Sequence, residues 1–196
     1  MVTRVESILM LLDIFVPGLS ERGLRQWQQQ HWSRLKSLAW SWCGDADLAE
    51  DLVQECFTRA LKHRRQLKDT EQLKPWLLKI LHNVYLDYLK SAQRREIPAS
   101  EFKLADTFAS DTSDPVVQYE QSQRAVQLRR AVAALPEPQR KVITLVDLQE
   151  LTYRQCAEVL DVPTGTVMSR LSRARQTLHE YLSARPTGRS TLRRIK

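Results

Sequence analysis

Residues 135–178 read LPEPQRKVITLVDLQELTYRQCAEVLDVPTGTVMSRLSRARQTL and contain a short helical pattern, a break and a longer helical pattern. Thr152 and Gln155 have the spacing of a capping box, which predicts that the short helix begins there. The break at residues 161–165 precedes a second helix with a continuous apolar stripe. A short helix, a tight turn and a longer helix are typical of a helix-turn-helix, whose second helix enters the major groove of DNA.

Three residues in and around the break support this geometry. Ala157 is small where the two helices must approach closely, and Val167, ten residues later, is expected to fill their shared core. Asp161 stands at a turn position that requires positive φ, which Asp adopts more readily than most residues, at some cost. The alternative is a bare helical hairpin with a cationic surface.

The second helix of this pair carries side chains that suit DNA. Those expected to project from it are Thr166, Met168, Ser169, Arg170, Ser172, Arg173 and Arg175. Ser, Thr and Arg contact base edges and phosphates, so this helix is the candidate DNA-reading element.

Composition predicts a helical protein with a packed core. The 196 residues include 30 Lys and Arg against 23 Asp and Glu, a net charge of +7, and only 5 Gly. This favours an all-α fold. No apolar run reaches the ~18 residues of a membrane span, and the run at residues 7–16 is a poor secretory signal because Asp13 interrupts it. Cys43, Cys56 and Cys156 are odd in number and widely spaced, which indicates reduced thiols in a cytoplasmic protein rather than disulfides or a zinc site.

The charge is distributed unevenly along the chain. Residues 96–120 have six acids against one Lys, two prolines and no sustained helical period, so they are predicted to form an acidic flexible linker. Two helical domains follow from this division, at residues 24–95 and 121–182. Residues 1–23 form a leader of unknown role, and residues 183–196, with five bases and no acid, are expected to be a disordered tail.

Three helices are predicted in the N-terminal domain. Apolar residues from Leu24 to Trp42 recur at helical spacing, and Gly44-Asp45 ends that helix and begins the next. The second helix has an apolar stripe and, on its other side, an acid-and-amide face that includes Asp51, Gln54 and Glu55. Such a face is either a solvated surface or a docking site for a basic protein partner.

The third helix begins at Pro75 and runs to the basic residues near 95. Its predicted core stripe is Trp76, Leu77, Ile80, Leu81, Val84, Tyr88 and Leu89. The polar positions include Lys79, Asn83, Asp87 and Lys90. An amide can pair with a base edge while cations hold phosphates, so this face suits nucleic acid, although a solvated face has the same composition.

The stretches GDADLAEDLVQECFTRAL and PWLLKILHNVYLDYLK, followed by residues 135–178, resemble bacterial RNA polymerase sigma factors of the extracytoplasmic-function (ECF) class. The resemblance covers residues 24–182. It implies two helical domains, region 2 and region 4, in a promoter-specificity subunit that binds core RNA polymerase and initiates transcription at specific promoters. It leaves open an anti-sigma factor as a further partner, because many members are held inactive by one.

The resemblance also implies roles for single residues. Asp51, Gln54 and Glu55 would dock on the β′ subunit of the polymerase. Asn83 would line a pocket for a flipped base of the minus-ten element, with Lys79, Asp87 and Lys90 beside it. The second helix of the C-terminal domain would read the minus-thirty-five element. Met168 and Val146 depart from the arginines that other members have there, so the recognised minus-thirty-five sequence stays open.

Two other functions compete with this interpretation. An autonomous helix-turn-helix regulator would bind promoter DNA without core polymerase. A small helical hydrolase would use Asp47, Glu50 and Asp51 as metal ligands, but no matching acidic pair is predicted to face them. Because the sequence contains no nucleophile set, phosphate-binding loop or metal-ligand cluster, we expect no catalytic activity, no cofactor and no metal.

Overall fold

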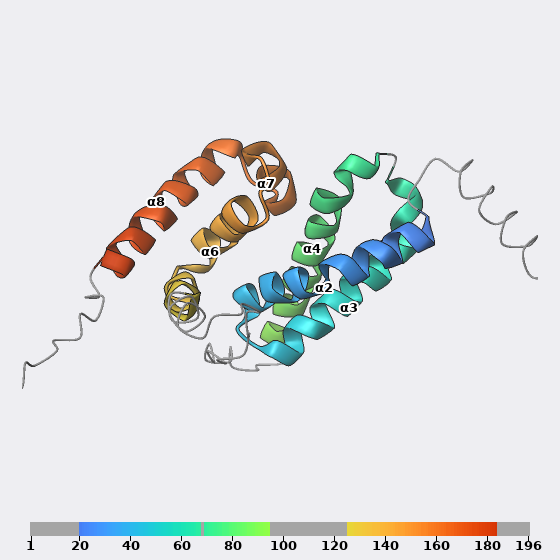
Figure 1. The fold of residues 1–196 in the computed structure, drawn as a ribbon, viewed down its shortest axis with the longest axis horizontal. Coiled ribbons are helices and arrows are strands. Elements are labelled where there is room, and N and C mark those ends of the chain that lie inside the picture. Colours follow the sequence, from blue (N-terminus) through green and yellow to red (C-terminus); the bar gives the residue numbers. More distant parts are fainter. Residues whose placement is uncertain (1–19, 68, 95–124, 184–196) are drawn as a thin grey trace, which may run out of the picture.

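The computed structural model describes residues 20–67, 69–94 and 125–183, and its regular elements in these ranges are all helical (Figure 1). This confirms the all-α prediction. None of the described helices combines the length and the hydropathy of a membrane span. The linker predicted at residues 96–120, most of the leader and nearly all of the basic tail lie outside the described residues.

The N-terminal helices are α2 (Glu21–Cys43), α3 (Ala46–His63) and α4 (Leu73–Arg94). The short 3₁₀ turns η1 (Arg64–Gln66) and η2 (Thr70–Gln72) join α3 to α4. Gly44 adopts a left-handed conformation with φ 72°, and the Asp45 carboxylate then caps α3 by accepting hydrogen bonds from two backbone N–H groups at 2.9 Å. The predicted boundary at Gly44-Asp45 is confirmed.

The buried side of α4 differs from the predicted core stripe. Leu77, Leu81 and Val84 are buried as expected, but Tyr88 is 37% exposed. The additional buried positions on α4 are Leu73, Leu78, His82 and Tyr85. The reason is that α7 packs along α4 on the side that the sequence left to solvent, so α4 lies between α7 and the α2–α3 pair (Figure 1).

The C-terminal helices are residues 125–133, α6 (Glu137–Ile143), η3 (Thr144–Leu148), α7 (Tyr153–Leu160) and α8 (Thr164–Ser183). The η3 segment is a π turn, in which the Gln149 N–H donates to the Thr144 carbonyl at 3.0 Å. A π turn inserts one extra residue and shifts the helical register. Leu148, an apolar residue at the end of this turn, is consequently 60% exposed.

The predicted helix-turn-helix is present as α7, a three-residue turn and α8. Thr152 and Gln155 form both hydrogen bonds of the capping box. Asp161 adopts the left-handed conformation that the sequence indicated, with φ 54° and ψ 51°. Ala157 is 8% exposed and Val167 is completely buried, so both lie in the shared core of the two helices.

The N-terminal and C-terminal helices pack against each other and share one continuous core. The main contacts join α4 to α7 and α2 to α6. At their centre the indole N–H of Trp42 donates a hydrogen bond of 3.0 Å to the Thr144 hydroxyl, 102 residues away in the sequence. The sequence predicted two helical domains but gave no indication of this contact.

We predict that Asp161→Gly stabilises the protein by about 0.5–1 kcal/mol, because Gly adopts positive φ without the steric cost of a Cβ atom. The measurement is urea denaturation followed by circular dichroism. Asp161→Ala, which keeps a Cβ atom and loses the Asp side chain, is the control and should lower stability. A Gly variant that is no more stable than the wild type would contradict strain at this turn.

Candidate functional site

The acid-and-amide face of α3 is exposed, as the sequence predicted. Asp51, Gln54 and Glu55 lie on the solvent side of the helix, opposite the buried Leu52 and Val53. Glu55 forms an ion pair of 2.8 Å with Arg59 on the next turn, whereas the side chains of Asp51 and Gln54 form no hydrogen bond or ion pair within the described residues. We call these three residues the acidic face.

Lys79, Asn83, Asp87 and Lys90 are all exposed and follow one another along a single side of α4. Their spacing of four, four and three residues is the spacing of one helix face. Within the described residues neither lysine pairs with a carboxylate, so both ammonium groups can contact phosphates. We call these four residues the α4 stripe.

Arg59 connects the acidic face to the α4 stripe. Its guanidinium donates to Glu55 at 2.8 Å and to the Asp87 carboxylate of α4 at 2.6 Å. These two hydrogen bonds raise the pKa of Arg59. The sequence analysis missed this residue. Its spacing from Glu55 could have revealed the first ion pair, but the second joins residues 28 apart.

Four of the seven candidate residues of α8 form a continuous exposed strip. Met168, Ser169, Ser172 and Arg173 all face solvent, and Met168 is 54% exposed although it is apolar. The Ser169 hydroxyl donates its hydrogen to the Thr166 carbonyl at 3.0 Å, which leaves its oxygen free to accept from a base. Thr166 is half-buried at one flank. We call the four exposed residues the α8 strip.

Arg170 and Arg175 lie at the edges of this strip. Arg170 is half-buried. Arg175 binds both oxygens of the Asp147 carboxylate, at 2.7 and 3.2 Å, and these bonds raise its pKa. A fork-like pair of this kind holds the guanidinium in a fixed orientation. Arg175 is exposed like the strip beside it, but its guanidinium is engaged by Asp147.

The described residues include no group of three or more His, Cys, Asp and Glu that could hold a metal ion. Glu50, one of the three carboxylates considered as metal ligands, pairs with Lys36 of α2. The three cysteines are free thiols. Burial raises the pKa of Cys43 to about 11 and that of Cys56 and Cys156 to about 12, so little reactive thiolate exists at neutral pH.

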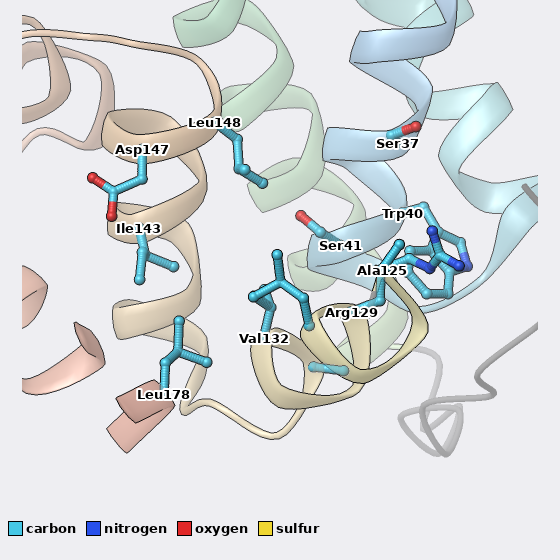
Figure 2. A pocket seen from close by; sticks show the side chains of 12 residues that line it. Ser37, Trp40, Ser41, Ala125, Arg129, Val132, Ile143, Asp147, Leu148 and Leu178 are labelled. Atoms are coloured by element: carbon cyan, nitrogen blue, oxygen red, sulfur yellow. The ribbon is translucent and has the colours of Figure 1, made fainter. Parts of the chain in front are cut away.

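An open groove of about 520 Å³ lies where the two groups of helices meet (Figure 2). Its walls come from α2, residues 125–133, α6 with η3, and α8. Most of the lining side chains are apolar, and two of them, Leu128 and Leu148, are 42% and 60% exposed. The groove therefore presents apolar surface to solvent beside the contact between the two groups of helices.

Two family models match the chain in the same order as the helices. Residues 28–95 match Sigma-70 region 2, and residues 125–178 match Sigma-70, region 4. Among similar proteins, the ECF RNA polymerase sigma factor SigM of Bacillus subtilis is 32% identical over 68% of this chain and 79% of its own length. The chain belongs to the ECF class of RNA polymerase sigma factors. It is accordingly a promoter-specificity subunit and not an autonomous regulator.

Other relatives agree with this assignment. The ECF sigma factor EcfG of Rhodopseudomonas palustris is 33% identical over 76% of this chain and 78% of its own length. Among solved structures, the sigma factor RpoE in complex with the anti-sigma factor NepR from Bartonella quintana has a TM-score of 0.66 at 25% identity, covering 81% of this chain and 96% of that one. CnrH in complex with the cytosolic domain of CnrY shares the fold, with a TM-score of 0.57 at 21% identity over 84% and 90% of the chains.

Proposed function

We propose that this ECF sigma factor uses three separate exposed surfaces: the acidic face for core RNA polymerase, the α4 stripe for the minus-ten element, and the α8 strip for the minus-thirty-five element. The observation that supports this division is that the polar residues that the family resemblance assigns to these roles are largely exposed, on three different helices. In the minus-thirty-five site Thr166, Arg170 and Arg175 flank the strip.

The acidic face is proposed to bind the β′ subunit of core polymerase, while the β subunit completes the polymerase contact. Asp51 and Gln54 are exposed and have unengaged side chains within the described part of the chain. A carboxylate beside an amide offers acceptors to Arg or Lys and both donors and acceptors to polar groups. On a chain with a net charge of +7, this small negative surface directs a basic partner to one place.

Asn83 is proposed to hold a flipped base of the minus-ten element. It lies in the middle of the α4 stripe, with Lys79 and Asp87 one turn away on either side. An Asn amide can form two hydrogen bonds with an adenine edge. Flipping a base costs a few kcal/mol, and hydrogen bonds and stacking in the pocket offset that cost, so base recognition and strand opening occur together.

The α8 strip combines three kinds of contact. Arg173 provides a fork for a guanine edge or a phosphate, and the Ser hydroxyls serve either bases or phosphates. Met168 provides an apolar surface suited to a thymine methyl group rather than to the acceptors of guanine. The sigma factor performs no chemistry of its own in this scheme and acts in the cytoplasm, together with core polymerase and promoter DNA.

An anti-sigma factor is proposed as a further partner. Two similar proteins have solved structures in complex, RpoE with the anti-sigma factor NepR and CnrH with the cytosolic domain of CnrY. The apolar groove beside the contact between region 2 and region 4 offers surface for such a protein, with Leu128 and Leu148 exposed in it.

Reversing the charge of the acidic face should weaken polymerase binding. We expect Asp51→Arg to lower the affinity for core polymerase about tenfold or more, because a basic partner would meet a like charge. The measurement is fluorescence anisotropy of the labelled sigma factor titrated with core enzyme. Glu180→Arg makes the same charge change on α8 and should leave affinity unchanged. Equal effects of both variants would contradict a docking role for this face.

Removing the Asn83 amide should impair promoter opening. We expect Asn83→Ala to reduce open-complex formation roughly tenfold, as permanganate reactivity of unpaired thymines reports, while core binding stays intact. Gln30→Ala removes an exposed amide from α2 and serves as the matched control. A parallel loss of core binding in the Asn83 variant would contradict a base pocket.

Arg173→Ala should weaken promoter binding by about 1–3 kcal/mol if Arg173 reads a base. If Arg173 holds a phosphate, the slope of log affinity against log salt concentration, the salt slope, should fall by about one in magnitude. Holoenzyme binding to promoter fragments with altered minus-thirty-five bases, measured at several salt concentrations, separates the two cases. Arg25→Ala removes an equal charge from α2. If affinity, base preference and salt slope all match the wild type, Arg173 does not contact DNA.

A further inference from the structure

The α4 stripe contains an acid, Asp87, although this surface is proposed to lie against DNA. Two lysines and one aspartate give the stripe a formal charge of +1. Asp87 lies one turn from Asn83, and side chains four positions apart on a helix have Cβ atoms about 5–6 Å from each other. A carboxylate so close to the proposed base contact repels the neighbouring phosphates. The stripe therefore suits DNA better when the Asp87 charge is neutralised.

Arg59 of α3 is the group that neutralises Asp87. Its Nη1 donates to the Asp87 Oδ2 at 2.6 Å, and Asp87 forms no other ion pair with the residues that the structure describes. Lys90, one turn away on α4, does not pair with it. The Asp87 side chain is 53% exposed. The charge of this part of the stripe is therefore set from another helix.

The same guanidinium is shared with the acidic face. Its Nε donates to the Glu55 Oε1 at 2.8 Å, so Glu55 and Asp87 each receive one hydrogen bond from Arg59. A guanidinium can instead give two parallel hydrogen bonds to a single carboxylate. Because Glu55 takes part of the guanidinium, Asp87 is only partly neutralised in the sigma factor alone.

Core polymerase would change this division. Glu55 belongs to the acidic face, which is proposed to meet basic side chains of the β′ subunit. A basic side chain that pairs with Glu55 replaces Arg59 there at little cost, because exposed ion pairs contribute little to stability. Both donors of the Arg59 fork can then turn to Asp87. The α4 stripe becomes more positive when polymerase binds on α3.

We propose that Arg59 couples core docking to minus-ten recognition, because polymerase takes Glu55 and the released guanidinium then neutralises Asp87. Arg59 is a positioning residue in this scheme, since it acts through Asp87 and contacts no base. The proposal rests on the proposed function, which assigns the acidic face to polymerase and the α4 stripe to DNA. Coupling of this kind is reciprocal, so minus-ten DNA also strengthens the binding of core polymerase.

Glu55→Gln imitates the docked state without polymerase, because it leaves Asp87 as the ionic partner of Arg59. The probe is a fluorescein-labelled non-template strand with the minus-ten element of a promoter identified by run-off transcription. We expect the full-length sigma factor alone to bind this strand about threefold more tightly, as measured by fluorescence anisotropy at low salt. Glu21→Gln frees Arg25 from the same kind of ion pair on α2 and is the matched control, with wild-type affinity expected.

The gain must depend on Arg59. In an Arg59→Ala background, Glu55→Gln should leave affinity for the strand unchanged, because no guanidinium remains to be released. An equal gain with and without Arg59 would show a direct effect of the Glu55 charge on DNA and would overturn the proposal. Glu55→Gln with no gain over the wild type would overturn it as well, even if Arg59→Ala failed to fold.

A second test follows the Asp87 charge in the holoenzyme. Arg59→Ala should lower the affinity of the holoenzyme for the same strand about fivefold, and adding Asp87→Asn should restore most of it. A structural ion pair predicts no such rescue, because the double variant also lacks the pair. In an Asp87→Asn background, Arg59→Ala should cost less than about twofold. A fivefold loss in both backgrounds would mean that Arg59 contacts DNA itself and would overturn the proposal.

Asn83→Ala in the same holoenzyme assay separates this proposal from the proposed function. If Asn83→Ala leaves the affinity for the strand unchanged, the assignment of the α4 stripe to the minus-ten element fails, and the coupling fails with it. If Asn83→Ala weakens binding while Arg59→Ala does not, only the coupling through Arg59 is overturned. Losses in both variants, with rescue of Arg59→Ala by Asp87→Asn, support both.

Discussion

The burial of α4 against two sets of neighbours is the constraint on which the rest of the structure depends. One part of its buried surface packs on α3 and completes region 2, and the other part packs on α7 and joins region 2 to region 4. The rest of the helix surface is exposed, and Asn83 lies on it. The helix proposed to read the minus-ten element is therefore also the helix that holds the DNA-reading helix pair of region 4 in place.

The parts of the fold that could be predicted from the sequence depend on local interactions. The capping box at Thr152 and the turn residues Gly44 and Asp161 satisfy or direct the backbone within a few positions, so their residue types identify them directly. The exposure of the acidic face also followed from helical periodicity, because the apolar stripe of α3 packs within its own region. Such features do not depend on what the other region does.

Most of the features that the sequence did not indicate depend on residues far apart in the chain. His82 is polar and occupies a position that periodicity assigns to solvent, yet α7 buries it. The ion pairs of Arg59 and Arg175 each join residues 28 apart. Leu148 is exposed because a π turn shifts the helical register, and helical periodicity assumes a constant register. Non-local packing therefore accounts for most of the differences between expectation and structure.

The polar interactions of the molecule fall into two energetic classes. Ion pairs on the proposed binding surfaces, such as Arg59 with Asp87, are substantially exposed, and pairs of this kind contribute about 0–1 kcal/mol, so a partner can replace them with little loss. The hydrogen bond from Trp42 to Thr144 is buried, and breaking it without separating the regions leaves an unsatisfied donor. If the regions separate, water can hydrogen-bond to the Trp42 N–H and to the Thr144 hydroxyl. The contact between the regions therefore favours either full closure or full opening over intermediate states.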